Sequence, residues 1–300
     1  MIRQIAVPPF HLLDPFLPKP SITDVPTRDG VATILADVAA RGDEAVRHWT
    51  RTLDGMDLPP DAWELPRAEW ESALDRIEHD VREALETAVQ RVREYHRRQR
   101  DPGFTLLQED GSILGMRVMP LERVGLYVPG GKAAYPSSVI MNAVPAVVAG
   151  VEQIIAVTPP QGVTDAVLAA CQLAGVSRLY RIGGAQAVGA LAFGTATVPR
   201  VDKIVGPGNR WVAEAKRQVA GPVGIDMIAG PTEILIIADS TALPERIAAD
   251  LIAQAEHDED ASAWCVTTDM QLADRLPAAL ERLLAKNPRA DVARASLARN

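Results

Sequence analysis

The sequence of 300 residues predicts an α/β fold built on parallel sheets that carry helices on both faces. First, short apolar runs alternate with helical patterns from residue 124 to residue 286, an order typical of parallel strands joined by helices. Second, glycines cluster directly after several of these runs. Third, 47% of the residues are hydrophobic and 23% are charged, which suits a globular chain whose length suggests two domains.

The N-terminal part of the chain lacks this alternation. Residues 1–24 are rich in proline, so we expect an extended arm. Apolar residues then recur at helical steps over 31–38. Gly42 is expected to end that helix and Asp43 to cap the next one. Residues 67–100 are predicted to be helical as well.

The strand and helix pairs begin after this helical region. Apolar residues at every second position predict strands over 114–118 and 124–128. The later strands are predicted over 153–158, 178–182, 203–205, 234–238 and 262–268, and the helices over 137–149, 165–174, 185–193, 210–219, 244–256 and 271–286. Because each strand is followed by a helix, we expect the strands to be parallel.

Glycines cluster at the ends of predicted strands. They are Gly130-Gly131, Gly183-Gly184, Gly206 with Gly208, and Gly230. In open α/β sheets, ligands bind beyond the carboxyl ends of the strands, and glycine permits close approach of the backbone. An ordinary tight turn is the alternative interpretation of any one of them. The Gly-Pro-Gly segment lacks the third glycine of the dinucleotide fingerprint, so it is a weak signal by itself.

Three polar side chains lie beside these glycines: Tyr127, Gln186 and Asn209. A tyrosine can stack on or hydrogen-bond a ring, and an amide can bond ribose or carboxamide groups. Each residue, taken alone, is better explained as an ordinary loop residue whose hydrogen bonds are satisfied.

Gln254 and His257 are three residues apart on a predicted helix, so they share a face. Imidazole is a good zinc ligand, whereas a glutamine oxygen is a rarer one. The alternative is a histidine that caps the helix or packs in the core. The sequence offers no convincing third ligand nearby, because the other histidines, His11, His48, His79 and His96, lie in the first third of the chain.

Charge and hydropathy argue against several classes of protein. The net charge of −8 does not favour nucleic-acid binding. No apolar run reaches the length of a membrane helix, and the start lacks the layout of a signal peptide, so we expect a cytoplasmic protein. The two cysteines share no metal-binding or redox spacing.

Five segments taken together resemble the histidinol dehydrogenase family. They are VGLYVPGGKAAYPSSVIMNAVPA (124–146), RIGGAQAVGALAFGT (181–195), KIVGPGNRWVAEAKR (203–217), GIDMIAGPTEILIIAD (224–239) and DLIAQAEHDEDA (250–261). The resemblance extends from about residue 25 to residue 285. With the strand pattern, it implies two incomplete Rossmann-like domains. One comprises 25–122 plus 236–300, and the other is an NAD-binding domain over 123–235 inserted in the first.

The resemblance also implies residue roles in binding. Tyr127, Gln186 and Asn209 match positions that contact NAD in the family. Gln254 and His257 match two of its zinc ligands. Thr232, Gln254 and His257 together match positions that contact the histidinol substrate. Serine often occupies the position of Thr232, and threonine keeps the hydroxyl group.

The family oxidises L-histidinol to L-histidine through L-histidinal, with two NAD in turn, and works as a homodimer. Its acid–base pair lies in a Pro-Glu-His motif that this sequence lacks. We therefore expect no catalytic pair before Asn300, a chain that is incomplete at its C-terminal end, and no turnover by the 300 residues alone. The alternatives are a related NAD-dependent dehydrogenase of another small alcohol and a non-catalytic truncation that binds NAD.

Overall fold

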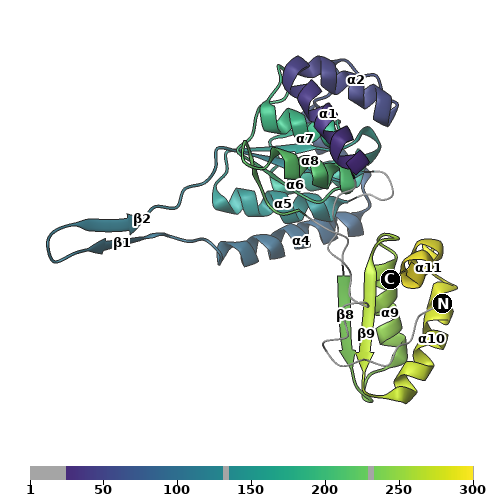
Figure 1. Cartoon of the computed structure of the whole chain (residues 1–300). Coiled ribbons are helices and arrows are strands. Elements are labelled where there is room, and N and C mark those ends of the chain that lie inside the picture. The colour runs from purple at the N-terminus through teal and green to yellow at the C-terminus, as the bar shows by residue number, and fades with distance from the viewer. Residues whose placement is uncertain (1–24, 131–134, 229–232, 300) are drawn as a thin grey trace. The chain divides into compact units, whose positions relative to one another are not determined.

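The computed structural model describes residues 25–130, 135–228 and 233–299. The chain divides between Ala229 and Gly230 into two compact units, each of which has its own hydrophobic core (Figure 1).

The larger unit is built on a parallel sheet of five strands. They are β3 (Arg123–Tyr127), β4 (Gln153–Val157), β5 (Arg178–Tyr180), β6 (Lys203–Val205) and β7 (Gly224–Ile225). Their order is β5-β4-β3-β6-β7, and Leu126 of β3 pairs with Ala156 of β4 and Val205 of β6. Counted from β3, this is the order 3-2-1-4-5 of a Rossmann sheet with one strand fewer, which confirms the predicted incomplete Rossmann-like fold.

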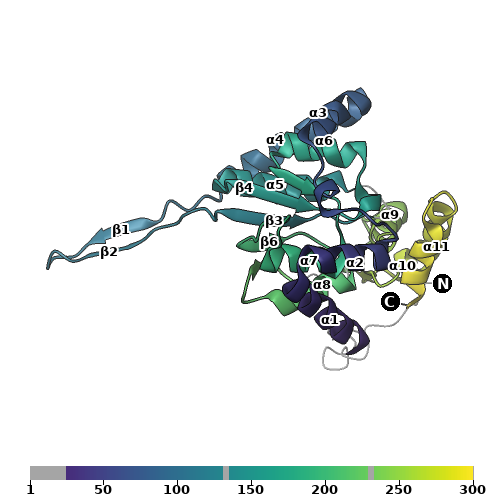
Figure 2. The same cartoon turned by 90° about the horizontal axis from the view of Figure 1, so that it is seen from above.

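Helices cover both faces of this sheet, as the view from above shows (Figure 2). One face carries α1 (Val25–Arg41), α2 (Asp43–Asp54), α7 (Gly184–Phe193) and α8 (Arg210–Val219), and the other carries α3 (Arg67–Arg76), α4 (His79–Arg97), α5 (Pro136–Ala149) and α6 (Asp165–Ala174). Successive side chains of a strand alternate between the two cores: Tyr127 and Val157 belong to the first, Leu126 and Ala156 to the second. Both faces are therefore buried, as expected of a parallel sheet.

A β-hairpin extends away from the body of the larger unit (Figure 1). Strands β1 (Phe104–Leu107) and β2 (Ile113–Met116) pair antiparallel, and every residue in them is exposed. The sequence pattern over 114–118 did predict a strand, but a shorter one forms, and it lies outside the parallel sheet. Its partner is the preceding strand, because the turn closed by the Gln108 amide and the Ser112 carbonyl joins them directly.

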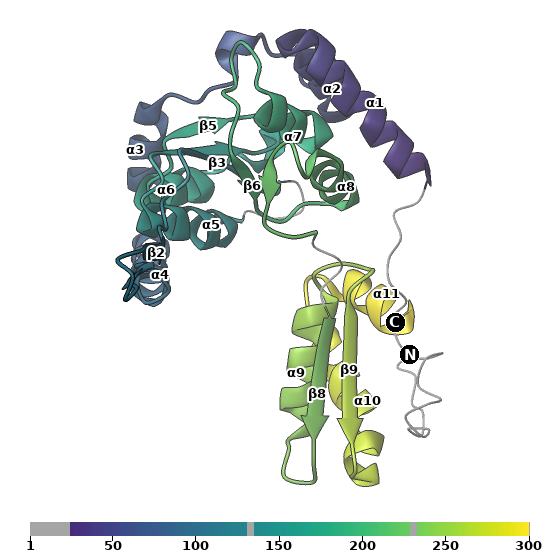
Figure 3. The same cartoon turned by 60° about the vertical axis from the view of Figure 1, so that its left-hand side comes forward.

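The smaller unit pairs two parallel strands, β8 (Glu233–Ala238) and β9 (Ser262–Thr267). Its helices are α9 (Pro244–Ala255), α10 (Met270–Leu284) and α11 (Ala290–Arg299). They lie on one face of the strands (Figure 3), where Ile236 and Cys265 pack on the helix side chains. Leu235 and Ile237 point to the other face and are exposed.

Two predictions about the helices are corrected. Asp43 was predicted to cap α2, but it is the first residue of the helix, and its carboxylate accepts a hydrogen bond from the Thr197 hydroxyl at 2.7 Å. Gly42 ends α1 as predicted, with a φ of 55°. The predicted helix over 67–100 is two helices, because Ile77 adopts an extended conformation between α3 and α4.

The N-terminal helices pack onto the helices that cover the parallel sheet of the larger unit. Helix α1 contacts α7 and α8, and α3 and α4 contact α6 and α5. We expected residues 25–122 to share a domain with 236–300. The helices over 25–97 bury their apolar side chains against segment 123–225. The predicted division into a domain of 25–122 plus 236–300 and a domain of 123–235 remains a proposal.

Candidate functional site

The candidate site of the larger unit lies at the carboxyl edge of the sheet, where the strand order reverses between β3 and β6. The loops after β3, β4 and β5 touch there. A Cβ added to Gly130 would lie 2.7 Å from the Gly162 Cα, and one added to Gly183 would lie 2.9 Å from the Pro159 Cα. These distances are too short for a side chain, so glycine is needed for the loops to meet. Gly131 and Gly230 of the predicted clusters lie outside the described residues.

Tyr127 ends β3 and connects two of these loops. Its side chain is buried, and its Oη accepts a hydrogen bond from the Gly184 amide at 3.0 Å. Burial raises the pKa of the phenol to about 12, and the nearby Asp54 carboxylate raises it too. The phenol is therefore neutral at physiological pH, and it keeps its own proton to donate.

Gln186 lies in the first turn of α7 and is completely buried. Its Nε2 donates to Asp54 Oδ2 at 3.2 Å. Its Oε1 has no hydrogen-bond partner among the described residues. A buried acceptor without a partner is costly, so this oxygen suits the hydroxyl or amide donors of a bound ligand. Gly184 makes room for it, since a Cβ there would lie 2.5 Å from Oε1.

Asn209 is the N-cap of α8. Its Oδ1 accepts hydrogen bonds from the amides of Trp211 at 3.0 Å and Val212 at 3.1 Å. The residue is exposed, and the NH₂ half of its amide remains to face a ligand. The loop that carries it begins at Gly206, which lies against Tyr127: a Cβ there would be 2.3 Å from the Tyr127 carbonyl oxygen. The structure thus brings Tyr127 together with the loops of both Gln186 and Asn209.

Three further residues at this edge had escaped the sequence reasoning. Asp54 bonds Gln186 from the end of α2, and no local pattern marks it. Beside Gly206, the buried Lys216 forms an ion pair with Asp226, whose side chain is partly exposed. Lys216 did leave a signal, because it stands among the buried positions of α8, with Val212, Ala215 and Val219.

The predicted zinc residues lie in the smaller unit. Gln254 is half-buried on α9, and His257 follows the end of that helix and is exposed. His257 Nδ1 lies 2.6 Å from the Ala253 carbonyl oxygen. A carbonyl can only accept, so Nδ1 is the donor here and Nε2 is the ring nitrogen that is left to bind a metal. The histidine therefore satisfies the capping alternative without losing its capacity as a ligand.

These two residues are an incomplete set for a metal. The described residues contain no group of three or more His, Cys, Asp or Glu side chains that could hold an ion. A catalytic zinc usually takes three protein ligands, so Gln254 and His257 fit zinc as a part of a site. Thr232, the remaining predicted substrate residue, lies outside the described residues.

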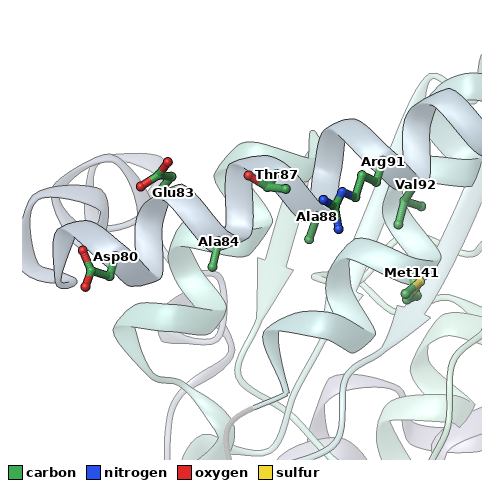
Figure 4. A pocket seen from close by; sticks show the side chains of 8 residues that line it. All are labelled: Asp80, Glu83, Ala84, Thr87, Ala88, Arg91, Val92 and Met141. Carbon is green, nitrogen blue, oxygen red and sulfur yellow. The ribbon is translucent and has the colours of Figure 1, made fainter.

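A shallow groove elsewhere on the larger unit runs between α4 and α5 (Figure 4). Its lining is Asp80, Glu83, Ala84, Thr87, Ala88, Arg91, Val92 and Met141. None of these residues belongs to the glycine loops, and the charged ones line α4 as an ordinary solvated helix face.

The two cysteines are free, and burial raises the pKa of the Cys171 thiol to about 12.

Known proteins share both the sequence and the fold. The sequence profile described as histidinol dehydrogenase matches residues 18–300. Histidinol dehydrogenase of Bordetella parapertussis is 57% identical over 270 residues, which cover 89% of this chain and 61% of that protein. The Pseudomonas aeruginosa histidinol dehydrogenase is 52% identical over 288 residues, which cover 95% of this chain and 66% of that protein.

The crystal structure of histidinol dehydrogenase from Elizabethkingia anophelis superposes with a TM-score of 0.90 at 33% identity, covering 97% of this chain and 67% of that one. The chain spans 61% of the length of the first relatives it matches. The match of the profile over nearly the whole sequence, with the high identity and the common fold, shows that the chain belongs to the histidinol dehydrogenase family.

Proposed function

We propose that this chain supplies the NAD site and part of the zinc site of an enzyme that oxidises L-histidinol to L-histidine through L-histidinal. Two NAD would be used in turn, in the last steps of histidine biosynthesis. One observation carries the proposal: at the carboxyl edge of a Rossmann-like sheet, in a chain of this family, Tyr127 contacts the loops that carry Gln186 and Asn209.

The residues at the sheet edge fit a dinucleotide. NAD, when bound, supplies the hydride acceptor. Gln186 Oε1 is a buried acceptor that a ribose hydroxyl or carboxamide NH₂ would satisfy. Tyr127 would donate its phenolic proton, and the Asn209 NH₂ would hydrogen-bond the part of the ligand nearest the start of α8. Together they bind and orient the cofactor without taking a proton from the substrate.

The residues of the smaller unit fit a share of the zinc and substrate site. Zinc, when bound, would position the imidazole and amine of histidinol. Gln254 would offer its carbonyl oxygen and His257 its Nε2, and both would contact the substrate with Thr232. Because a complete structural or catalytic site uses more protein ligands, we expect zinc to bind this chain weakly in a competition with a chelator. Tight stoichiometric zinc that H257A abolishes would contradict that expectation.

The proposal is tested by turnover and binding together. The sequence has no Pro-Glu-His motif and no histidine after His257, so we expect no group here that takes the alcohol proton. Purified chain given L-histidinol, NAD and zinc should bind NAD in calorimetry but form no NADH above background. Absence of NAD binding would contradict the proposed function, and robust NADH formation would contradict the predicted inactivity.

We also propose that the enzyme is a cytoplasmic homodimer. Helices long and apolar enough to cross a bilayer are absent from the residues that the structure describes. The hairpin of β1 and β2 presents Leu107, Ile113 and Leu114 to solvent, and large exposed apolar patches favour association. Sedimentation of this chain against L107D/I113D, which changes no buried residue, would show whether the hairpin contributes to a dimer.

A further inference from the structure

We propose that Lys216 and Asp226 are positioning residues that fix the loop Gly206–Asn209 in the conformation that presents Asn209 to the cofactor. This inference rests on the proposed function, because that function makes the loop part of the NAD site.

The ion pair binds both backbone polar groups of Gly206, the N–H and the C=O. Lys216 Nζ donates to the Gly206 carbonyl oxygen at 2.9 Å and to Asp226 Oδ1. Asp226 Oδ2 in turn accepts from the Gly206 amide at 2.8 Å. Gly206 is therefore fixed at its N–H and at its C=O by two side chains that also bond each other.

These side chains come from separate elements. Lys216 is on the second turn of α8, and Asp226 directly follows β7. Asp226 Oδ1 also accepts from the Met227 amide at 2.7 Å. The pair thus connects the loop after β6 to α8 and to the segment that leaves the sheet after β7.

Stability alone does not account for a lysine at this place. The Lys216 side chain is 2% exposed and occupies a position on the buried side of α8. Removing an ammonium group from water is expensive, and a well-packed apolar side chain is often as stable as a buried ion pair or more stable. What an apolar side chain cannot do is donate to the Gly206 carbonyl, so the charge is explained by control of the loop.

Gly206 needs such control because its conformation is unusual. Its φ is 109°, a value that side chains disfavour, and it packs directly against the backbone of Tyr127. Glycine is also the residue with the most conformations available to it. Lys216 and Asp226 together form a clamp on Gly206. With this clamp in place, the position of Gly206 determines where Asn209 starts α8.

The test compares two ion pairs on the same helix. Glu214 and Arg217 also join a buried and a half-exposed side chain on α8, and Glu214 accepts hydrogen bonds from Arg217 and Gln218 of the same helix. K216M removes the clamp, and E214Q is the matched control that weakens the other pair. D226N, which nearly preserves shape, is the second variant if K216M fails to fold.

The readouts are amide exchange over 206–209 in the free protein and the NAD dissociation constant from calorimetry. We expect K216M and D226N to speed exchange over 206–209 and to weaken NAD binding by about tenfold, the effect of losing one charge-assisted hydrogen bond. E214Q should change both by less than about twofold.

Unchanged exchange over 206–209 in D226N or K216M would overturn the clamp, as would an equal effect of E214Q. If the clamp variants exchange faster over 206–209 but the unmodified chain does not bind NAD, the clamp stands and the proposed function is refuted. Faster exchange with unaltered NAD affinity would show that the clamp does not position the cofactor, and would overturn the inference.

Discussion

The side-chain amide of Gln186, at the carboxyl edge of the sheet, has only one of its two polar groups hydrogen-bonded among the described residues. One half of its amide bonds Asp54, and the other half is buried without a partner among the described residues. Q186L keeps the approximate size of the side chain but removes both halves. We expect NAD binding to weaken by about tenfold or more, because at least one hydrogen bond to the ligand is lost.

Q172L is the matched control for that substitution. Gln172 also has a buried Oε1 with no partner among the described residues, but it lies near the end of α6 and not in the glycine loops. Calorimetry should give Q172L the same NAD dissociation constant as the unmodified chain. Equal weakening by both substitutions would mean that Gln186 acts on the fold and not on the ligand.

Asp54 makes the stability of the larger unit depend on pH. Burial raises the pKa of its carboxyl above the ordinary 3.8, and the hydrogen bond from Gln186 offsets only a part of this effect. Below the unfolded-state pKa both states are protonated. Above it the folded state binds more protons, so the contribution of Asp54 to stability falls as the pH rises through the folded-state pKa.

D54N cannot ionise and should escape that loss. We expect the free energy of unfolding of D54N, relative to the unmodified chain, to rise as the pH is raised above 3.8. Urea titrations at several pH values, followed by tryptophan fluorescence, measure this difference. A difference that is constant with pH would show that the Asp54 pKa is the same in the folded and unfolded states.

At the scale of elements, the loop after β6 depends on glycine for two separable reasons. Gly206 has a positive φ and also lies against Tyr127, whereas Gly221 has a φ of 114° with nothing within 4 Å of an added Cβ. G221A should therefore lower the free energy of unfolding by about 1–2 kcal/mol through backbone strain alone. G206A should cost more than about 3 kcal/mol, because a clash with backbone is added.

Urea denaturation of both glycine variants gives these values, provided that the slope of the transition stays unchanged. Four of the five tryptophans lie in the larger unit, so their fluorescence reports mainly on its unfolding. If G206A and G221A lost equal stability, the loop would have room to move away from Tyr127, and the tight contact would not fix its position.

The elements of the parallel sheet could be predicted closely because strands buried on both faces appear as short apolar runs, and helices buried on one face leave a helical period. The predicted strand 203–205 and the helices over 165–174 and 210–219 agree with the structure residue for residue. The pattern missed β1, every residue of which is exposed, and it did not show that β2 pairs with β1 outside the parallel sheet. It also failed at Asp43, whose partner, Thr197, is 154 residues away.

At the scale of the whole molecule, the site is made by contacts between distant segments. Tyr127, Gln186 and Asn209 could be identified as candidates from the sequence because each stands beside a glycine turn and within a motif of the family. Asp54 could not, because it meets Gln186 across 132 residues of sequence. The ion pair beside Gly206 depends likewise on how α8 and β7 pack, which no local spacing encodes.

The two units hold different parts of the proposed binding residues. The larger unit holds the residues proposed to bind NAD, and the smaller unit holds Gln254 and His257. Both sets belong to a chain that spans 61% of the length of its first relatives. NAD binding is therefore the property that the described residues should show by themselves.

Hydrogen–deuterium exchange with and without NAD tests that central claim most directly. We predict that NAD slows exchange in three loops of the larger unit, 127–130, 183–186 and 206–209, and leaves the hairpin over 104–116 unchanged. Protection that appears elsewhere, or no protection in these loops at saturating NAD, would contradict the assignment of the carboxyl edge of the sheet as the cofactor site.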